Sequence, residues 1–137
     1  MLERILVPLD GSELSEAVLP QVRRLLLRKD AEVLLLQVAE VDYLPTYESS
    51  RLRTELPELA QQYVRRVARR LEEEGVRTRP LVATGAAATE ILAAAADHKA
   101  SLIALSSHGR TGLSRWSMGS VAEKLFRASP IPVLAMR

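Results

Sequence analysis

Short apolar runs alternate along the chain with longer stretches in which apolar residues recur every three or four positions. The short runs have the length of strands, and most lack the apolar–polar alternation of a half-exposed strand. Near-continuous apolar runs are typical of strands that are buried on both faces of a parallel sheet. The five predicted strands are Arg4–Leu9, Glu32–Ala39 and residues 77–83, 101–106 and 131–136. Pro80 places the third of them at a sheet edge, because proline cannot donate a ladder hydrogen bond.

The stretches between these runs have helical periodicity. They cover residues 14–26, 51–74, 89–98 and 119–127. Ser12 or Ser15 is suited to cap the first helix, and Gly75 is suited to end the second. Pro57 indicates that the second helix either begins or kinks there. Residues 40–50 are predicted to form a loop or lid.

The fourth helix opens with Gly119-Ser120, and Ser120 to Glu123 matches a capping box. The order of elements is therefore β-α-β-α-β-α-β-α-β. It predicts an α/β fold: an open, doubly wound, five-stranded parallel sheet, Rossmann-like, with four helices and strand order 3-2-1-4-5. No linker or repeat divides residues 1–137, so we expect one domain.

Composition excludes several classes of protein. There is no cysteine among the 137 residues, so disulfides, thiolate metal sites and thiol nucleophiles are absent. Two histidines cannot build a His-rich zinc site. A formal charge of +2 is weak evidence for nucleic-acid binding. No run approaches the length of a membrane span and no signal-peptide core is visible, so a cytoplasmic protein is expected.

Two loops carry the densest clusters of glycine, serine and threonine, namely Asp10-Gly11-Ser12 and residues 106–120. With strand order 3-2-1-4-5, both follow strands at the point where the order reverses, which is where such sheets bind ligands. Gly119-Ser120 at a helix start offers backbone N–H groups to an anion, and Arg110 could add charge. Neither a Walker motif nor a dinucleotide fingerprint is present.

Three segments in this order resemble the universal stress protein family, in its single-domain form. They are residues 5–12 (ILVPLDGS), residues 102–113 with 118–124 (LIALSSHGRTGL, MGSVAEK) and residues 129–134 (SPIPVL). The resemblance covers essentially the whole chain. It implies a dimer, and its ATP-binding branch carries the pattern Gly-x2-Gly-x9-Gly-Ser/Thr.

Gly109, Gly119 and Ser120 match this pattern, and Ser106 stands where its first glycine is expected. The resemblance implies ATP, with AMP or ADP as alternatives and Mg²⁺ held through the phosphates. It places the Asp10 carboxylate near base and ribose, and main-chain groups of Val38 and Ala39 near adenine. The expected cofactor-binding residues are Pro8, Leu9, Asp10, Val38, Ser106, His108, Gly109, Arg110, Gly119, Ser120 and Val121.

Simpler interpretations stand beside these. Asp10 also suits a plain Asp-Gly turn, Ser120 a helix cap, and Val38 an ordinary strand end. Ser107 and His108 are adjacent and lack an orienting acid, so they are not read as a nucleophile and base. The second predicted helix has a basic face. Ion pairs between its arginines and glutamates four residues later explain this face, for instance the pair of Arg70 with Glu74.

The sequence thus favours an adenine-nucleotide-binding stress-response or signalling module. The alternative is a dimeric interaction protein of the same fold that binds no nucleotide, and the residue at 106 separates the two. No catalytic constellation can be assembled, and slow ATP hydrolysis or self-phosphorylation is the most that the resemblance implies. The uncharged strand from Ile131 to Met136 is expected to form the homodimer, and any further protein partner is unspecified.

Overall fold

The computed structural model describes residues 3–40, 46–107 and 118–137. Its single sheet has the strand order β3-β2-β1-β4-β5, and all paired neighbours run parallel. The strands are β1 (Arg4–Leu9), β2 (Glu32–Ala39), β3 (Arg77–Thr84), β4 (Leu102–Ser106) and β5 (Val133–Met136). The expected fold class and strand order are confirmed, including the edge position of the strand that contains Pro80.

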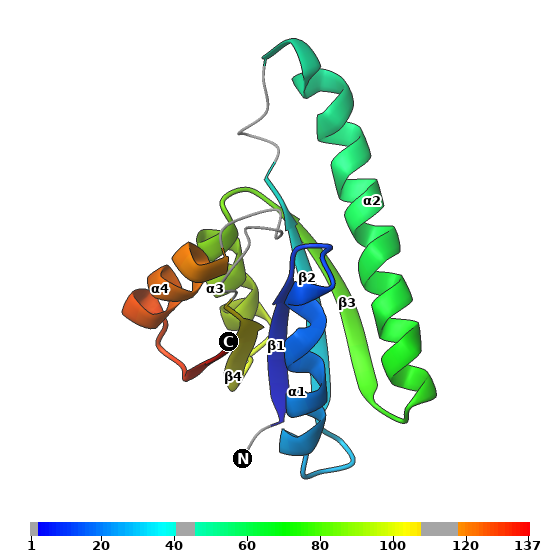
Figure 1. Ribbon diagram of the computed structural model, residues 1–137, viewed down its shortest axis with the longest axis vertical. Helices are drawn as coiled ribbons and strands as arrows, with labels where there is room; N and C mark the ends of the chain where they lie inside the picture. The colour runs from blue at the N-terminus through cyan, green and yellow to red at the C-terminus, as the bar shows by residue number, and fades with distance from the viewer. Residues whose placement is uncertain (1–2, 41–45, 108–117) are drawn as a thin grey trace.

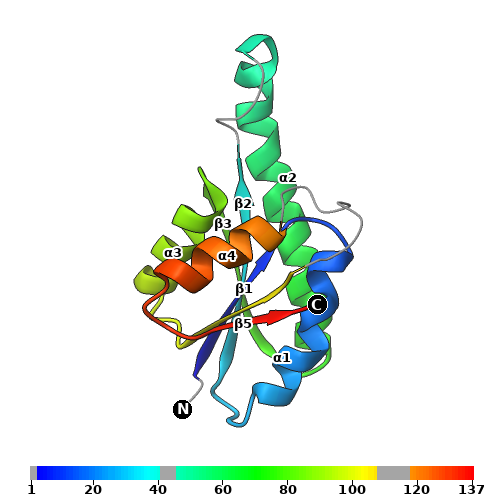
Figure 2. The same cartoon turned by 60° about the vertical axis from the view of Figure 1, so that its left-hand side comes forward.

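Helices cover both faces of the sheet (Figure 1). They are the 3₁₀ helix η1 (Leu14–Val18), α1 (Leu19–Leu25), α2 (Thr46–Glu73), α3 (Ala87–Asp97) and α4 (Met118–Ala128). The α1 and α2 helices lie on one face, and α3 and α4 lie on the other (Figure 2). Within the described ranges, no helix combines the length and apolarity needed to cross a bilayer.

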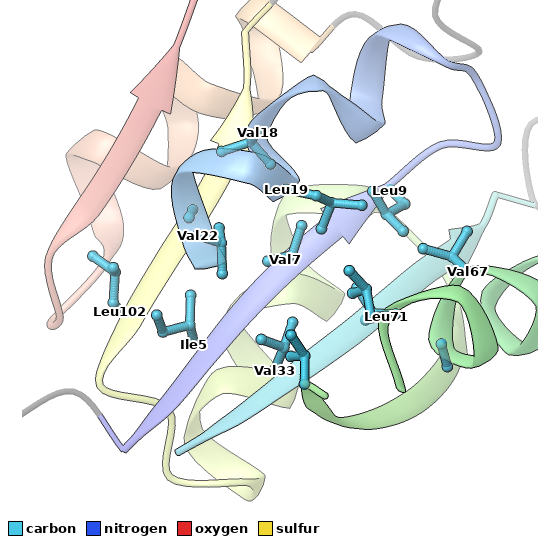
Figure 3. Close-up of a cluster of buried hydrophobic side chains, with 14 residues drawn as sticks. Ile5, Val7, Leu9, Val18, Leu19, Val22, Val33, Val67, Leu71 and Leu102 are labelled. Carbon is cyan, nitrogen blue, oxygen red and sulfur yellow. The ribbon is translucent and has the colours of Figure 1, made fainter. Parts of the chain in front are cut away.

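Alternate residues of each central strand feed two separate cores. On β2, Val33 and Leu35 pack under α1 and α2, whereas Leu34 and Leu36 pack under α3 and α4. Figure 3 shows the first cluster, in which side chains of β1 and β2 meet Val22 of α1 and Leu71 of α2. Both faces of β2 are therefore buried, which explains why its sequence is almost uninterruptedly apolar.

The α2 helix differs most from the sequence-based expectation. It begins at Thr46, so the prediction that it starts at Arg51 or at Pro57 was wrong, and so was the loop assigned to residues 46–50. Pro57 lies inside the helix. A proline removes one backbone hydrogen bond, which a helix of 28 residues survives. The first turns of α2 extend past the ends of the strands (Figure 1).

Gly75 ends α2 as expected. Its φ of 86° lies in the left-handed region, and the Val76 N–H donates to the Leu71 carbonyl at 2.9 Å. This pattern is the glycine-dependent Schellman motif, which satisfies carbonyls at the end of a helix.

Several smaller boundaries also moved, for example at α3, which begins at Ala87 and not at Thr89. The first helix begins with a 3₁₀ turn and ends at Leu25. The β5 strand begins at Val133 and not at Ile131, because Pro132 has no N–H to donate to the ladder. The α4 helix begins at Met118, so Ser120 is its third residue. The predicted capping box at Ser120 was therefore wrong, since a cap must precede the first turn.

Candidate functional site

The carboxyl ends of β1 and β4 lie side by side in the middle of the sheet. The chain leaves β1 toward α1 on one face and leaves β4 toward α4 on the other. This divergence makes the switch point where open α/β sheets bind ligands. Asp10 directly follows β1 and Ser106 ends β4, so the structure brings these two predicted residues to the same edge.

Asp10 is a fully buried carboxylate with only one of its oxygens engaged. Its Oδ1 accepts hydrogen bonds from the Ser12 N–H at 2.8 Å and the Ser12 hydroxyl at 2.5 Å, while Oδ2 is buried and has no partner among the described residues. Gly11 has a φ of 91°, which lets the chain turn sharply behind the carboxylate. The Asp-Gly turn of the simpler interpretation is therefore present, and it engages only Oδ1 of the Asp10 carboxylate. A buried acceptor of this kind is costly unless a donor reaches it.

Ser15 ties this turn to β4. Its hydroxyl accepts from the Asp10 N–H at 3.3 Å and donates to the Ser12 carbonyl at 2.7 Å. Its own carbonyl accepts from the Ser106 hydroxyl at 3.3 Å. Sequence reasoning considered Ser15 only as a helix cap and missed this role. The hydroxyl of Ser106 is thus directed at η1. The Ser12 hydroxyl accepts from the Ser15 N–H at 3.2 Å, but the cap position of η1 is held by Glu13, whose side chain makes no capping hydrogen bond, so the expected cap at Ser12 or Ser15 was wrong.

Val38 presents backbone atoms to the same edge. The β1–β2 ladder ends at the Leu9–Gln37 pair, whereas the β2–β3 ladder continues to Ala39 and Thr84. The Ala39 carbonyl accepts from the Gly85 N–H on the β3 side. Neighbouring residues of a strand direct their backbone groups to opposite sides, so the Val38 carbonyl points to the β1 side, beyond the end of β1.

Glu40 anchors the end of β2, although the sequence analysis placed it in the loop. Its Oε1 accepts from the Ala87 N–H at 2.9 Å, at the start of α3. A carboxylate at a helix N-terminus satisfies a backbone donor and complements the helix dipole. The bond fixes the direction in which the chain leaves the site.

The remaining predicted residues fall into three groups. Gly119 and Ser120 are exposed in the first turn of α4. Pro8, Leu9 and Val121 are buried core residues, so their side chains serve packing. His108, Gly109 and Arg110 lie outside the described residues.

A charged network lies behind the Asp10 turn. Glu16 of η1 accepts from the Tyr63 hydroxyl at 2.6 Å and from the Arg70 guanidinium at 2.5 Å, both on α2. Burial, reinforced by Glu16, raises the pKa of Tyr63, and the hydrogen bond to Glu16 raises the pKa of Arg70. The expected pairing of Arg70 with Glu74 within the helix was wrong, because Glu74 pairs instead with Arg23 of α1 at 3.2 Å. Packing of α2 against η1 and α1 supplies both charges with partners from other elements.

Comparison with known proteins assigns the family. The model of the universal stress protein family matches residues 1–137. Universal stress protein MJ0531 of Methanocaldococcus jannaschii is 34% identical, over 98% of this chain and 82% of the relative.

Solved structures agree with this assignment. The structure of protein MJ0577 of the same organism superimposes with a TM-score of 0.85 at 31% identity, covering 99% of this chain and 96% of that one. A family member from Arabidopsis thaliana with AMP bound has a TM-score of 0.71 at 16% identity, with 97% and 90% coverage. A universal stress protein in complex with cAMP has a TM-score of 0.68 at 18% identity, with 99% and 97% coverage. The chain belongs to the universal stress protein family.

Proposed function

We propose that this chain is an adenine-nucleotide-binding stress or signalling protein that acts as a homodimer. The observation that carries the proposal is the buried Asp10 carboxylate at the switch point, whose Oδ2 finds no partner within residues 3–40, 46–107 and 118–137. A ribose hydroxyl of a bound nucleotide would donate a hydrogen bond to this oxygen. Support for the adenine class comes from the AMP and cAMP complexes of two proteins with the same fold.

The residues around Asp10 fit the parts of such a ligand. The Val38 carbonyl would accept from the exocyclic amine of adenine, and the first turn of α4 would receive the phosphates. Gly119 suits that approach, because a Cβ at this position would meet no protein atom within 4 Å. Mg²⁺ would be held through phosphate oxygens, since the described residues include no group of three side chains that could hold a metal ion. The proposal assigns the protein no chemical step.

The dimer would form through β5. This strand is at the sheet edge next to β4, and no strand of the described residues pairs with its other side. Leu134 is 38% exposed there, which is a large fraction for an apolar strand residue. A two-fold axis would place the same edge on both subunits and pair the two copies of β5.

Nucleotide titration tests the proposal. We expect a micromolar dissociation constant for ATP, or about −8 kcal/mol, and a higher melting temperature with ATP and Mg²⁺ present. Asp10→Asn replaces the unpartnered acceptor by a donor, and we expect at least tenfold weaker binding. Asp97→Asn, at an exposed position of α3, is the matched control.

Native mass spectrometry of the freshly purified protein adds a second measurement, since it reports bound nucleotide and dimer mass together. A dimer without nucleotide, and without a melting shift at millimolar ATP, would favour the alternative of an interaction protein that binds none.

A further inference from the structure

A cavity of about 150 Å³ lies between α2 and the turn that follows β1. Its lining includes Gly11, Gln37 and the α2 residues Leu59, Ala60, Tyr63 and Arg66. Gly11 directly follows Asp10, and Gln37 directly precedes Val38. The cavity therefore adjoins both strand ends that carry the proposed nucleotide contacts.

Gln37 is a polar residue within the otherwise apolar run that follows Glu32 in β2. Gln37 lies two positions after Leu35 and four after Val33, so its side chain is on the same face of β2 as theirs, the face covered by α2. Only 6% of the residue is exposed, and its Oε1 is buried with no hydrogen-bond partner in the part of the chain that the structure describes. Packing alone would favour a leucine or methionine here, because an unpartnered buried amide costs stability. The glutamine is better explained by a donor that arrives with a ligand.

The size and lining of the cavity suit the edge of a flat heterocycle. A cavity of 150 Å³ is about the size that accommodates one benzene ring. Leu59 and Ala60 supply apolar surface, and the Arg66 guanidinium lies 5.8 Å from the centre of the Tyr63 ring. A primary amide matches adenine in particular, because it can accept from the exocyclic amine while donating to the neighbouring ring nitrogen.

We propose that Gln37 selects the base of the bound nucleotide, with its Oε1 accepting an N–H of the adenine amine. This inference rests on the proposed function. The amine has two hydrogens, which serve Gln37 and the Val38 carbonyl together. Guanine has a carbonyl oxygen at the corresponding position and offers neither acceptor a hydrogen. The pair therefore favours adenine over guanine nucleotides.

The test compares ATP and GTP titrations of the wild type, Gln37→Met and Gln61→Met. Methionine keeps the volume of glutamine and removes the amide, so apo Gln37→Met should melt at or above the wild-type temperature. We expect its ATP affinity to fall about tenfold, within the range that an amide–adenine pair contributes, and the preference for ATP over GTP to fall by a similar factor. Gln61→Met changes an exposed glutamine of α2 that does not line the cavity, and this variant should behave as wild type.

The possible outcomes distinguish failure of the role of Gln37 from failure of the proposed nucleotide binding. Wild type that binds ATP, with Gln37→Met unchanged or weakened equally for ATP and GTP, would overturn the role of Gln37 alone. Wild type that binds no nucleotide would overturn both proposals. N6,N6-dimethyl-ATP tests the base contact without a variant: wild type should bind it at least tenfold more weakly than ATP, and equal affinity would contradict the inference.

Discussion

The hydroxyl of Ser106 has a partner within the protein, the Ser15 carbonyl at 3.3 Å. A serine at this motif position has two conceivable effects on a bound nucleotide: its Cβ would crowd the sugar, or its hydroxyl would contact it. The structure supports a third role, in which Ser106 holds η1 against β4. Because Ser15 also binds the Asp10 N–H, the orientation of the Asp10 turn depends on this bond.

Ser106→Ala should lower the free energy of unfolding by about 1 kcal/mol, since the hydrogen bond from the Ser106 hydroxyl to the Ser15 carbonyl is lost. Ser106→Gly should cost roughly 0.5–1 kcal/mol more, because glycine weakens a strand. We expect both variants to bind ATP within about threefold of wild type. Denaturant unfolding and calorimetric titration check the two quantities. Clearly tighter ATP binding by Ser106→Gly would show instead that the serine crowds the ligand.

At the scale of elements, one carboxylate connects η1 to the long helix α2. The Glu16 side chain is 16% exposed and binds both Tyr63 and Arg70. Burial and the Glu16 hydrogen bond raise the pKa of Tyr63 above its ordinary value of 10.0. The protonated phenol is therefore favoured in the folded state relative to the unfolded state, and this stabilisation is complete below pH 10.

Stability should fall as the pH rises above about 10, because the unfolded chain then releases a proton that folded Tyr63 retains. Tyr63→Phe has no such proton. The difference in unfolding free energy between wild type and Tyr63→Phe should therefore shrink as the pH rises from 9 to 11. Absorbance titration of the folded protein supplies the control, since the substitution should remove a phenol that ionises only above its ordinary pKa of 10.0. A constant difference across this range would contradict the role of the Tyr63 proton.

At the scale of the whole molecule, the sheet has two edges of unequal character. The β3 edge contains Pro80 and exposes Arg77, Arg79 and Thr84, whereas β5 is short and uncharged and exposes Leu134. Pro80 and charges such as Arg79 discourage strand addition at β3. The proposed dimer therefore uses β5.

Leu134→Lys should produce a monomer at tens of micromolar protein, because the symmetric interface would then bring two lysines together. Leu27→Lys is the matched control, since Leu27 is 87% exposed in the segment between α1 and β2. Sedimentation equilibrium should give a dimer for wild type and for Leu27→Lys. A wild-type mass of one chain would exclude the β5 dimer.

The sequence by itself determined the elements whose signals are local. Strands buried on both faces appear as apolar runs, and Glu32–Ala39 was predicted to the residue. Gly75 ends α2 because a left-handed residue is needed there, which a single glycine indicates. Asp10 was placed correctly because the order of elements restricts where β1 and β4 meet.

Only the tertiary structure decided which polar groups meet. Glu16 and Tyr63 are 47 positions apart, and Ser15 and Ser106 are 91 apart. Packing of η1 against α2 and β4 brings these residues together, and no periodicity of the sequence indicates which distant residues will meet in this way. The same holds for Gln37, whose polar side chain in an apolar strand became informative once α2 was seen to leave a cavity over it. Short-range patterns report burial and backbone geometry, whereas partners and cavities depend on how distant faces pack.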